Sequence, residues 1–119
     1  MMNGRERVQA ALAREPVDCV PLGFYAVDYD TVERVIGHKT YVRNKIGIRI
    51  ALWEGRRDEV AQSLKEDTVA FYRKIDCADV LLPKEAMLLP PRDYEPDPPT
   101  KIADDKWEDR HGRHYQGAP

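Results

Sequence analysis

The stretch RERVQAALAREPVDCVPLGFY, residues 5–25, joins a helical pattern to a strand pattern and decides how the chain opens. Its first half predicts an amphipathic helix that Pro16 ends. The apolar residues at helical spacing in this half are Val8, Ala11 and Leu12. Its second half, residues 19–25, is a short apolar run that predicts a first strand. Proline lacks an amide N–H, so we expect Pro21 at the start of that strand or at an irregularity.

The rest of the chain alternates helical and strand patterns. Three further helices are expected, at residues 31–36, 46–53 and 58–75. The last is the strongest, because four apolar residues line one face: Val60, Leu64, Phe71 and Ile75. A second strand, residues 78–82, is continuously apolar after Asp79, which is typical of a parallel strand buried on both faces. Two such strands separated by helices indicate parallel βα units and an α/β fold.

Capping residues mark several helix ends. Asn3 and Glu6 have the spacing of a capping box at the first helix. Asp30 is the expected N-cap of the second helix, and Gly37 is its expected left-handed stop. Asp79 lies inside an apolar strand, and we expect it to accept a hydrogen bond there, because a buried acid needs a partner.

Chain length indicates the number of domains, and net charge indicates which kinds of partner to expect. The 119 residues are a one-domain length. Net charge is −2, with 19 basic and 21 acidic residues interspersed, which gives no electrostatic reason to expect nucleic acid or a membrane as partner. We expect Cys19 and Cys77, which lie beside the strands, to be reduced, buried thiols, and the protein to be cytoplasmic.

The character of the sequence changes after residue 82. Residues 83–100 are a proline-rich connection that we expect to be extended and stiff. Residues 101–116 then have the pattern of a β-hairpin, with Trp107 and Tyr115 on opposite arms. We expect Trp107 to pack, as we do Trp53.

Three stretches give the chain a resemblance to a known family. Residues 3–21 hold the runs NGRERV, AAL, REPVD and VP, residues 77–80 read CADV after a long helix, and residues 107–113 read WEDRHGR. These stretches resemble the first part of uroporphyrinogen decarboxylase-like proteins. Residues 23–30 and 50–57 are similar to the branch of methyltransferases that exchange a methyl group with a corrinoid protein.

The resemblance implies that residues 1–119 are the N-terminal part of a single (β/α)8 TIM barrel. In that interpretation residues 1–82 supply the helices and the first two strands, 83–100 the loop, and 101–116 a β-hairpin insertion. A complete barrel takes about 250 residues, so the rest of the barrel would hold the late-strand site residues. The family further implies zinc and a corrinoid protein as cofactor and partner of the full barrel, with neither held by this chain.

Barrel enzymes bind substrate at the carboxyl ends of their strands, and the resemblance places four residues of this chain there. Tyr25 and Asp28 follow the first strand and are candidates for substrate binding, with a packed tyrosine and a turn aspartate as the alternative. Lys84, a further candidate for substrate binding, and Glu85, the candidate catalytic residue, follow the second strand, with a surface ion pair as the alternative. We expect His111 and His114 to be solvated or structural rather than metal ligands.

Two other functions stay open. Uroporphyrinogen decarboxylases carry an arginine-rich stretch after the first strand, which holds the substrate carboxylates. Here that position reads FYAVD, residues 24–28, and no arginine lies between Arg14 and Arg34. The carboxylate of Glu85 lies one residue out of register with the decarboxylase aspartate. The third function is a non-catalytic module that associates with itself through open strand edges.

Overall fold

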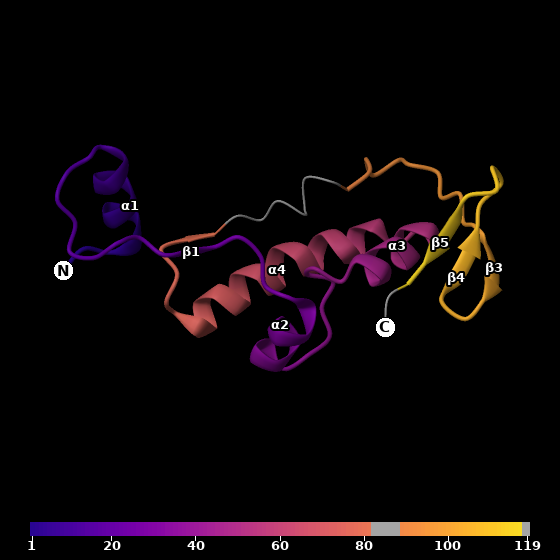
Figure 1. Cartoon of the computed structure of the whole chain (residues 1–119), viewed down its shortest axis with the longest axis horizontal. Coiled ribbons are helices and arrows are strands. Elements are labelled where there is room, and N and C mark those ends of the chain that lie inside the picture. The colour runs from indigo at the N-terminus through magenta and orange to yellow at the C-terminus, as the bar shows by residue number, and fades with distance from the viewer. Residues whose placement is uncertain (82–88, 118–119) are drawn as a thin grey trace.

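A computed structural model describes residues 1–81 and 89–117 of the chain. The molecule is mixed α/β and elongated, with α1 at one end and the three-stranded sheet at the other (Figure 1). Its principal extents are 57 × 28 × 21 Å. In chain order the elements are α1 (Gly4–Leu12), β1 (Gly23–Phe24), α2 (Tyr29–Ile36), α3 (Lys45–Trp53), α4 (Arg57–Ile75), β2 (Val80–Leu81), β3 (Thr100–Ala103), β4 (Lys106–Glu108) and β5 (His114–Gln116).

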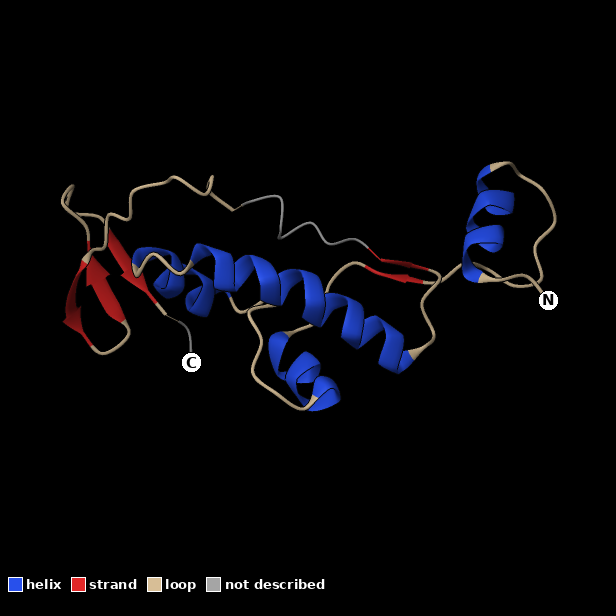
Figure 2. Ribbon diagram, turned by 180° about the vertical axis from the view of Figure 1, so that it is seen from behind, coloured by secondary structure: helices blue, strands red, loops and turns tan. Residues whose placement is uncertain are grey.

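The strands form two separate sheets (Figure 2). β1 and β2 pair in parallel, with Gly23 opposite Val80, and α2, α3 and α4 connect them along the chain. The predicted parallel pairing is confirmed. β3, β4 and β5 form an antiparallel sheet in chain order, in which Trp107 lies opposite Tyr115 as predicted for the hairpin arms. The hairpin prediction missed β3, so the segment has three strands instead of two.

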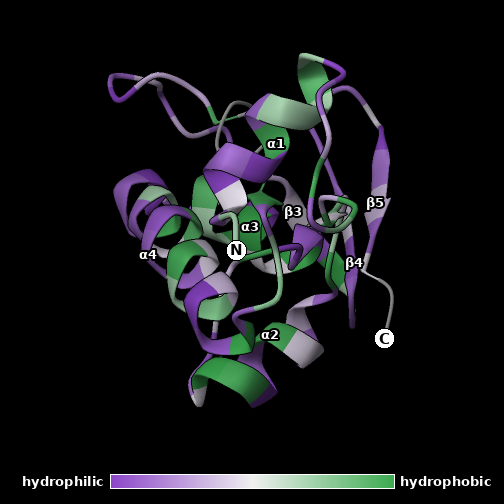
Figure 3. Ribbon diagram, turned by 90° about the vertical axis from the view of Figure 1, so that its left-hand side faces the viewer, coloured by the Kyte–Doolittle hydropathy of each residue, from purple (hydrophilic) through white to green (hydrophobic). Residues whose placement is uncertain are grey.

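Helix α4 is the centre of the helical body. α2 and α3 both pack against it. Ala51, Val60 and Leu64 form the buried core, and side chains from the segment before α3 and from Leu89 pack around them. Figure 3 shows hydrophilic residues on the outer side of α4 and hydrophobic residues toward the other helices. The periodicity predicted for α4 is therefore confirmed, including the buried Phe71.

Capping residues close in the sequence determine where the helices begin and end. Asn3 accepts a hydrogen bond from the backbone N–H of Glu6, and the Glu6 side chain accepts from the backbone of Asn3, so the predicted capping box is present. Gly37 ends α2 with φ +84°, a conformation that glycine adopts at little cost. The prediction of Asp30 as N-cap was wrong, because α2 begins at Tyr29.

The strands and α1 differ from the expectations in burial. β1 and β2 each span two residues, and both residues of β2 are exposed, because among the described residues no further strand lies beside them. The prediction of a strand buried on both faces was therefore wrong. α1 buries Arg7 and Ala10, and Leu12 of the predicted apolar stripe is 80% exposed. Cys19 and Cys77 are also exposed, which contradicts their expected burial.

The C-terminal sheet rests on α3 through aromatic side chains. The ring of Trp53 lies 5.5 Å from Trp107 and 5.6 Å from Tyr115. The guanidinium of Arg49 lies 5.4 Å from the centroid of the Tyr115 ring. The expected packing of both tryptophans is confirmed. In the described part of the proline-rich connection, the Tyr94 hydroxyl donates a 2.5 Å hydrogen bond to a carbonyl of α3, so this segment is tied to the helices.

Candidate functional site

The predicted site residues lie at the carboxyl end of β1 or outside the described residues. Tyr25 directly follows β1 and is 73% exposed. Asp28 is the N-cap position of α2, is exposed, and accepts no capping hydrogen bond in the described structure. Lys84 and Glu85 lie outside the described residues. The structure therefore places Tyr25 and Asp28 in one loop but brings neither against a second predicted site residue that it describes.

The opposite end of the β1–β2 ladder carries a cluster of charged residues. Arg7 of α1 donates to Asp18 through Nε (2.6 Å) and Nη2 (3.0 Å), and through Nη1 to Asp79. Asp79 also accepts a 2.9 Å hydrogen bond from the backbone N–H of Leu22. One buried guanidinium thus joins α1 to the chain just before both strands. The predicted hydrogen bond to Asp79 is confirmed, although its donor was not foreseen.

The electrostatics of this cluster stabilise the charged forms of its members. The hydrogen bond from Arg7 holds the pKa of Asp18 well below its usual range, and backbone N–H groups of Met2 and Cys19 act in the same direction. The hydrogen bond to Asp18 likewise raises the pKa of Arg7. Both groups are charged at neutral pH, and the cluster acts as a structural clamp rather than as an acid–base pair.

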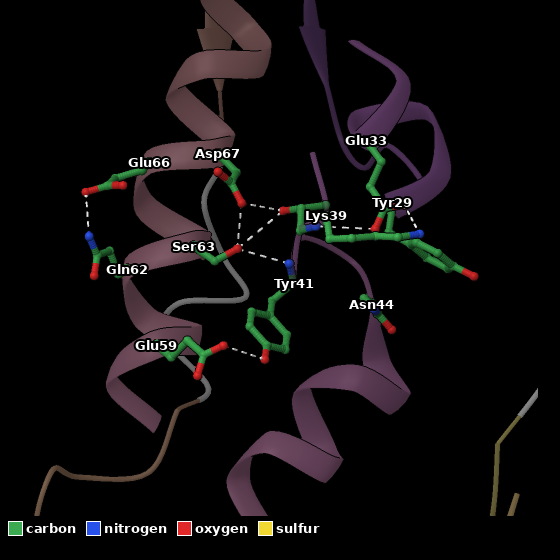
Figure 4. A pocket seen from close by; sticks show the side chains of 11 residues that line it. Tyr29, Glu33, Lys39, Tyr41, Asn44, Glu59, Gln62, Ser63, Glu66 and Asp67 are labelled. Carbon is green, nitrogen blue, oxygen red and sulfur yellow. Dashed lines mark hydrogen bonds and ion pairs between the residues drawn. The ribbon is translucent and has the colours of Figure 1, made fainter. Parts of the chain in front are cut away.

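A polar cleft of about 620 Å³ lies between α2, α4 and the segment that leads into α3 (Figure 4). Four carboxylates, an amine, two tyrosines and several smaller polar side chains line it. These residues are Tyr29, Glu33, Lys39, Thr40, Tyr41, Asn44, Glu59, Gln62, Ser63, Glu66 and Asp67. The sequence prediction did not identify this cleft. The sequence feature that indicates this cleft is a polar stripe at helical spacing on α4, formed by Glu59, Ser63 and Asp67.

A buried hydroxyl and carboxylate network forms the floor of the cleft. Asp67, which is 7% exposed, accepts hydrogen bonds from the hydroxyls of Thr40 (2.7 Å) and Ser63 (2.6 Å). The Ser63 oxygen accepts a 3.0 Å hydrogen bond from the backbone N–H of Tyr41, and Nε2 of His38 lies 3.7 Å from Asp67. Because each member of this network has a partner within the chain, we interpret it as the anchor that holds residues 38–42 on α4.

The remaining carboxylates of the cleft are also held by the chain itself. Glu33 accepts from Lys39 at 3.1 Å, and Glu66 accepts from Gln62 at 3.0 Å. Glu59 accepts from the hydroxyl of Tyr41 at 3.1 Å, and the pKa of Tyr41 is raised by its burial and by this hydrogen bond. Such fully partnered carboxylates are typical of structural networks.

Neither the cysteines nor the histidines gather into a ligand set. Among the described residues, no three His, Cys, Asp or Glu side chains are placed to hold a metal ion. His114 lies 3.1 Å from Glu108 across the sheet, and the backbone of His111 donates to Asp109. The described residues therefore do not fit the zinc that the family resemblance implies for the complete barrel.

Comparison with known proteins gave no match to any family model, curated protein or solved structure. In the described part of the chain, no helix has both the length and the apolar character that a membrane crossing requires.

Proposed function

We propose that this chain is the opening part of a uroporphyrinogen decarboxylase-like barrel of the corrinoid methyltransferase branch, and that it is inactive by itself. The observation that carries the proposal is the parallel pairing of β1 with β2 across a helical connection. Consecutive strands of a (β/α)8 barrel pair in this way, with helices packed outside the strands.

The two faces of the β1–β2 ladder support the same interpretation. Phe24 of β1 faces α4: its ring lies 6.1 Å from that of Tyr72, whose hydroxyl lies 3.5 Å from the Phe24 carbonyl oxygen. Side chains alternate along a strand, so Gly23 and its partner Val80 belong to the other face. Val80 is 48% exposed there, which is what the inner face of an incomplete barrel would leave uncovered.

The family resemblance supplies the chemistry. When bound to the complete barrel, a corrinoid would supply the methyl group and zinc would lower the pKa of an accepting thiol. Because the described residues do not fit zinc, we assign no step of this transfer to them. The role left to this chain is to contribute Tyr25 and Asp28, in the loop after β1, to one side of the substrate pocket. Lys84 as a substrate-binding residue and Glu85 as the catalytic candidate, which both lie outside the described residues, complete the proposal.

Tetrapyrrole decarboxylation is the weaker alternative. Its substrate carries several carboxylates, which arginine binds in bidentate fashion. The loop after β1 instead carries Asp28, whose exposed carboxylate would repel such a substrate. Binding of a polycarboxylate porphyrinogen to the completed protein would revive this alternative, and its absence would remove it.

The test is methyl transfer by the chain alone and by the chain combined with a polypeptide that supplies the later βα units. Methylcobalamin serves as the methyl donor and a small thiol as the acceptor, and the visible spectrum reports loss of the cobalt–carbon bond. We expect no transfer by the chain alone and measurable transfer by the combination. Absence of transfer by a combined protein that binds zinc would contradict the proposal.

Variants of the combined protein locate the contribution of this chain. Asp28→Asn, Tyr25→Phe and Glu85→Gln should each lower kcat/KM, by roughly tenfold or more if the side chain touches the substrate. Asp30→Asn is the matched control, because Asp30 is also an exposed aspartate but lies in the first turn of α2. Equal activity of all four variants would remove these residues from the site.

A further inference from the structure

One wall of the polar cleft is the segment that leads into α3. This segment contributes Lys39, Thr40 and Tyr41 to the lining, and the carboxylate of Asp67 on α4 anchors it. Both hydroxyl donors of the anchor reach the same carboxylate oxygen, because Thr40 and Ser63 donate to Oδ2 of Asp67 at 2.7 and 2.6 Å (Figure 4). The position of this wall therefore depends on how well a single carboxylate is satisfied.

The second oxygen of this carboxylate, Oδ1, lacks a donor. Within the described residues it accepts no hydrogen bond, although the Asp67 side chain is only 9% exposed. The group that lies beside it is the imidazole of His38, whose Nε2 is 3.7 Å from Oδ1. A carboxylate oxygen that is removed from water without a donor is unfavourable, so a proton on Nε2 would supply what the site lacks.

The other ring nitrogen of His38 determines where a neutral imidazole holds its proton. Nδ1 lies 2.9 Å from the carbonyl oxygen of Lys39, and a carbonyl can only accept, so Nδ1 is the protonated nitrogen. Nε2 of the neutral ring then presents a lone pair to Asp67 and cannot donate. In the imidazolium both nitrogens donate, and Nε2 can serve the oxygen that lacks a donor.

The charged groups around His38 belong to α2, α4 and its own segment. In the described part of the chain, Asp67 of α4 is the only carboxylate at ion-pair distance from the His38 ring. Glu33 of α2 is occupied by Lys39, whose ammonium lies 3.1 Å from it, so these two charges offset each other. The charged residues next to Glu33 and Asp67 in the two helices are exposed, where solvent screens them: Arg34, Lys65 and Glu66. Asp67 is therefore the charge that distinguishes imidazole from imidazolium.

We propose that His38 is a proton-sensitive contact, which holds this wall of the cleft more tightly on α4 when the imidazole is protonated. Histidine is the side chain that gains its charge between about pH 8 and pH 5. The stabilising contact requires the proton, so it is present at low pH and is lost as the pH rises. The inference concerns the cleft alone and does not depend on methyl transfer.

The experiment is hydrogen exchange of the Tyr41 amide, which donates to Ser63 and so reports opening of the segment. NMR measures its protection factor in the 119-residue chain, corrected for the intrinsic effect of pH on exchange. We expect protection roughly two- to fivefold higher at pH 5 than at pH 8, because the His38 side chain is 58% exposed and exposed ion pairs are weak. This difference should be lost in His38→Gln. His111→Gln is the matched control and should keep it, because His111 is also exposed but contacts Asp109 through its backbone.

The ring itself provides a second measurement. Long-range hydrogen–nitrogen correlation spectra identify which nitrogen of His38 carries the proton, and at pH 8 we expect a protonated Nδ1 and an unprotonated Nε2. Two outcomes overturn the proposal: a proton on Nε2 at pH 8, or the same pH dependence of Tyr41 protection in His38→Gln as in the unmodified chain. Neither outcome bears on methyl transfer, which is measured on the combined protein.

Discussion

Arg7 is the residue that fastens α1 to the rest of the described molecule. Its guanidinium reaches Asp18, Asp79 and the carbonyl of Met2, so one side chain ties the helix to segments 11 and 72 residues away. A planar group with five donors suits this arrangement, whereas a lysine ammonium is a point charge that cannot reproduce the fork. The clamp depends on the chemistry of arginine and not on charge alone.

Arg7→Lys should therefore loosen α1 and leave α4 unchanged. We expect faster hydrogen exchange of the α1 amides, by tenfold or more, because the ammonium cannot hold both carboxylates and the chain at once. Arg5→Lys is the control, since Arg5 lies in the same helix and is exposed. Equal exchange of α1 in the two variants would contradict the role given to Arg7.

The pH dependence of stability follows from the same cluster. The pKa of Asp18 is lowered in the folded state, so its contribution is complete above the unfolded value of about 3.9 and is lost as the pH falls below it. Urea unfolding between pH 6 and pH 3 should show a steeper loss of stability in the unmodified chain than in Asp18→Asn. Asp109 has its pKa lowered too, because hydrogen bonds from Arg113 and His111 outweigh its burial, and it contributes equally to both proteins. Parallel pH profiles would exclude the contribution of Asp18.

At the scale of elements, α4 organises the helical body. Its 19 residues carry the longest apolar stripe, with acidic residues in the first turn and basic residues in the last, as the helix dipole favours. α2 and α3 are shorter and depend on α4 for burial of their apolar faces. Damage to the stripe on α4 should therefore affect the whole helical body.

Leu64→Ala should lower the free energy of unfolding by about 2–5 kcal/mol, because it leaves a cavity in the core at a residue that is 3% exposed. Leu12→Ala is the matched control: Leu12 lies at the end of α1, is 80% exposed, and should change the free energy by less than about 0.5 kcal/mol. Urea titration followed by circular dichroism measures both. Similar losses in the two variants would show that Leu64 is not in the core.

The helices could be predicted from the sequence because their signals are local. The capping box of Asn3, the left-handed Gly37 and the stripe of α4 lie within a few residues of the structure they specify. The extent and burial of the strands could not be predicted from the sequence, because both depend on which other strands lie beside them. The apolar run at residues 78–82 specifies a buried strand, but the described chain supplies only β1 beside it.

The candidate site shows the same contrast between features that nearby residues specify and features that need contacts between distant residues. The sequence places Tyr25 and Asp28 after a strand, and the structure agrees, since that position follows from chain order. The clamp of Arg7 with Asp79 joins residues 72 positions apart, and no local sequence pattern indicates such a pair. The polar stripe on α4 was visible in the sequence, but the segment that packs over it to form the cleft was not.

At the scale of the whole molecule, the chain is more extended than a compact domain. The Cα radius of gyration is 18.3 Å, whereas a compact domain of this length has about 13.5 Å. The excess arises because α1 and the three-stranded sheet lie at opposite ends of the helical body (Figure 1).

Small-angle X-ray scattering of the chain, extrapolated to zero concentration, tests this shape. The expected radius of gyration is near 18.3 Å, since α1 is held at the far end of the molecule by Arg7 and cannot fold back onto α3 without breaking the clamp. Arg7→Lys releases α1 and should broaden the distance distribution, while Arg5→Lys leaves it unchanged. A radius near 13.5 Å would contradict this arrangement, because it would mean that α1 folds back onto the helical body and that the clamp of Arg7 does not hold it at the far end.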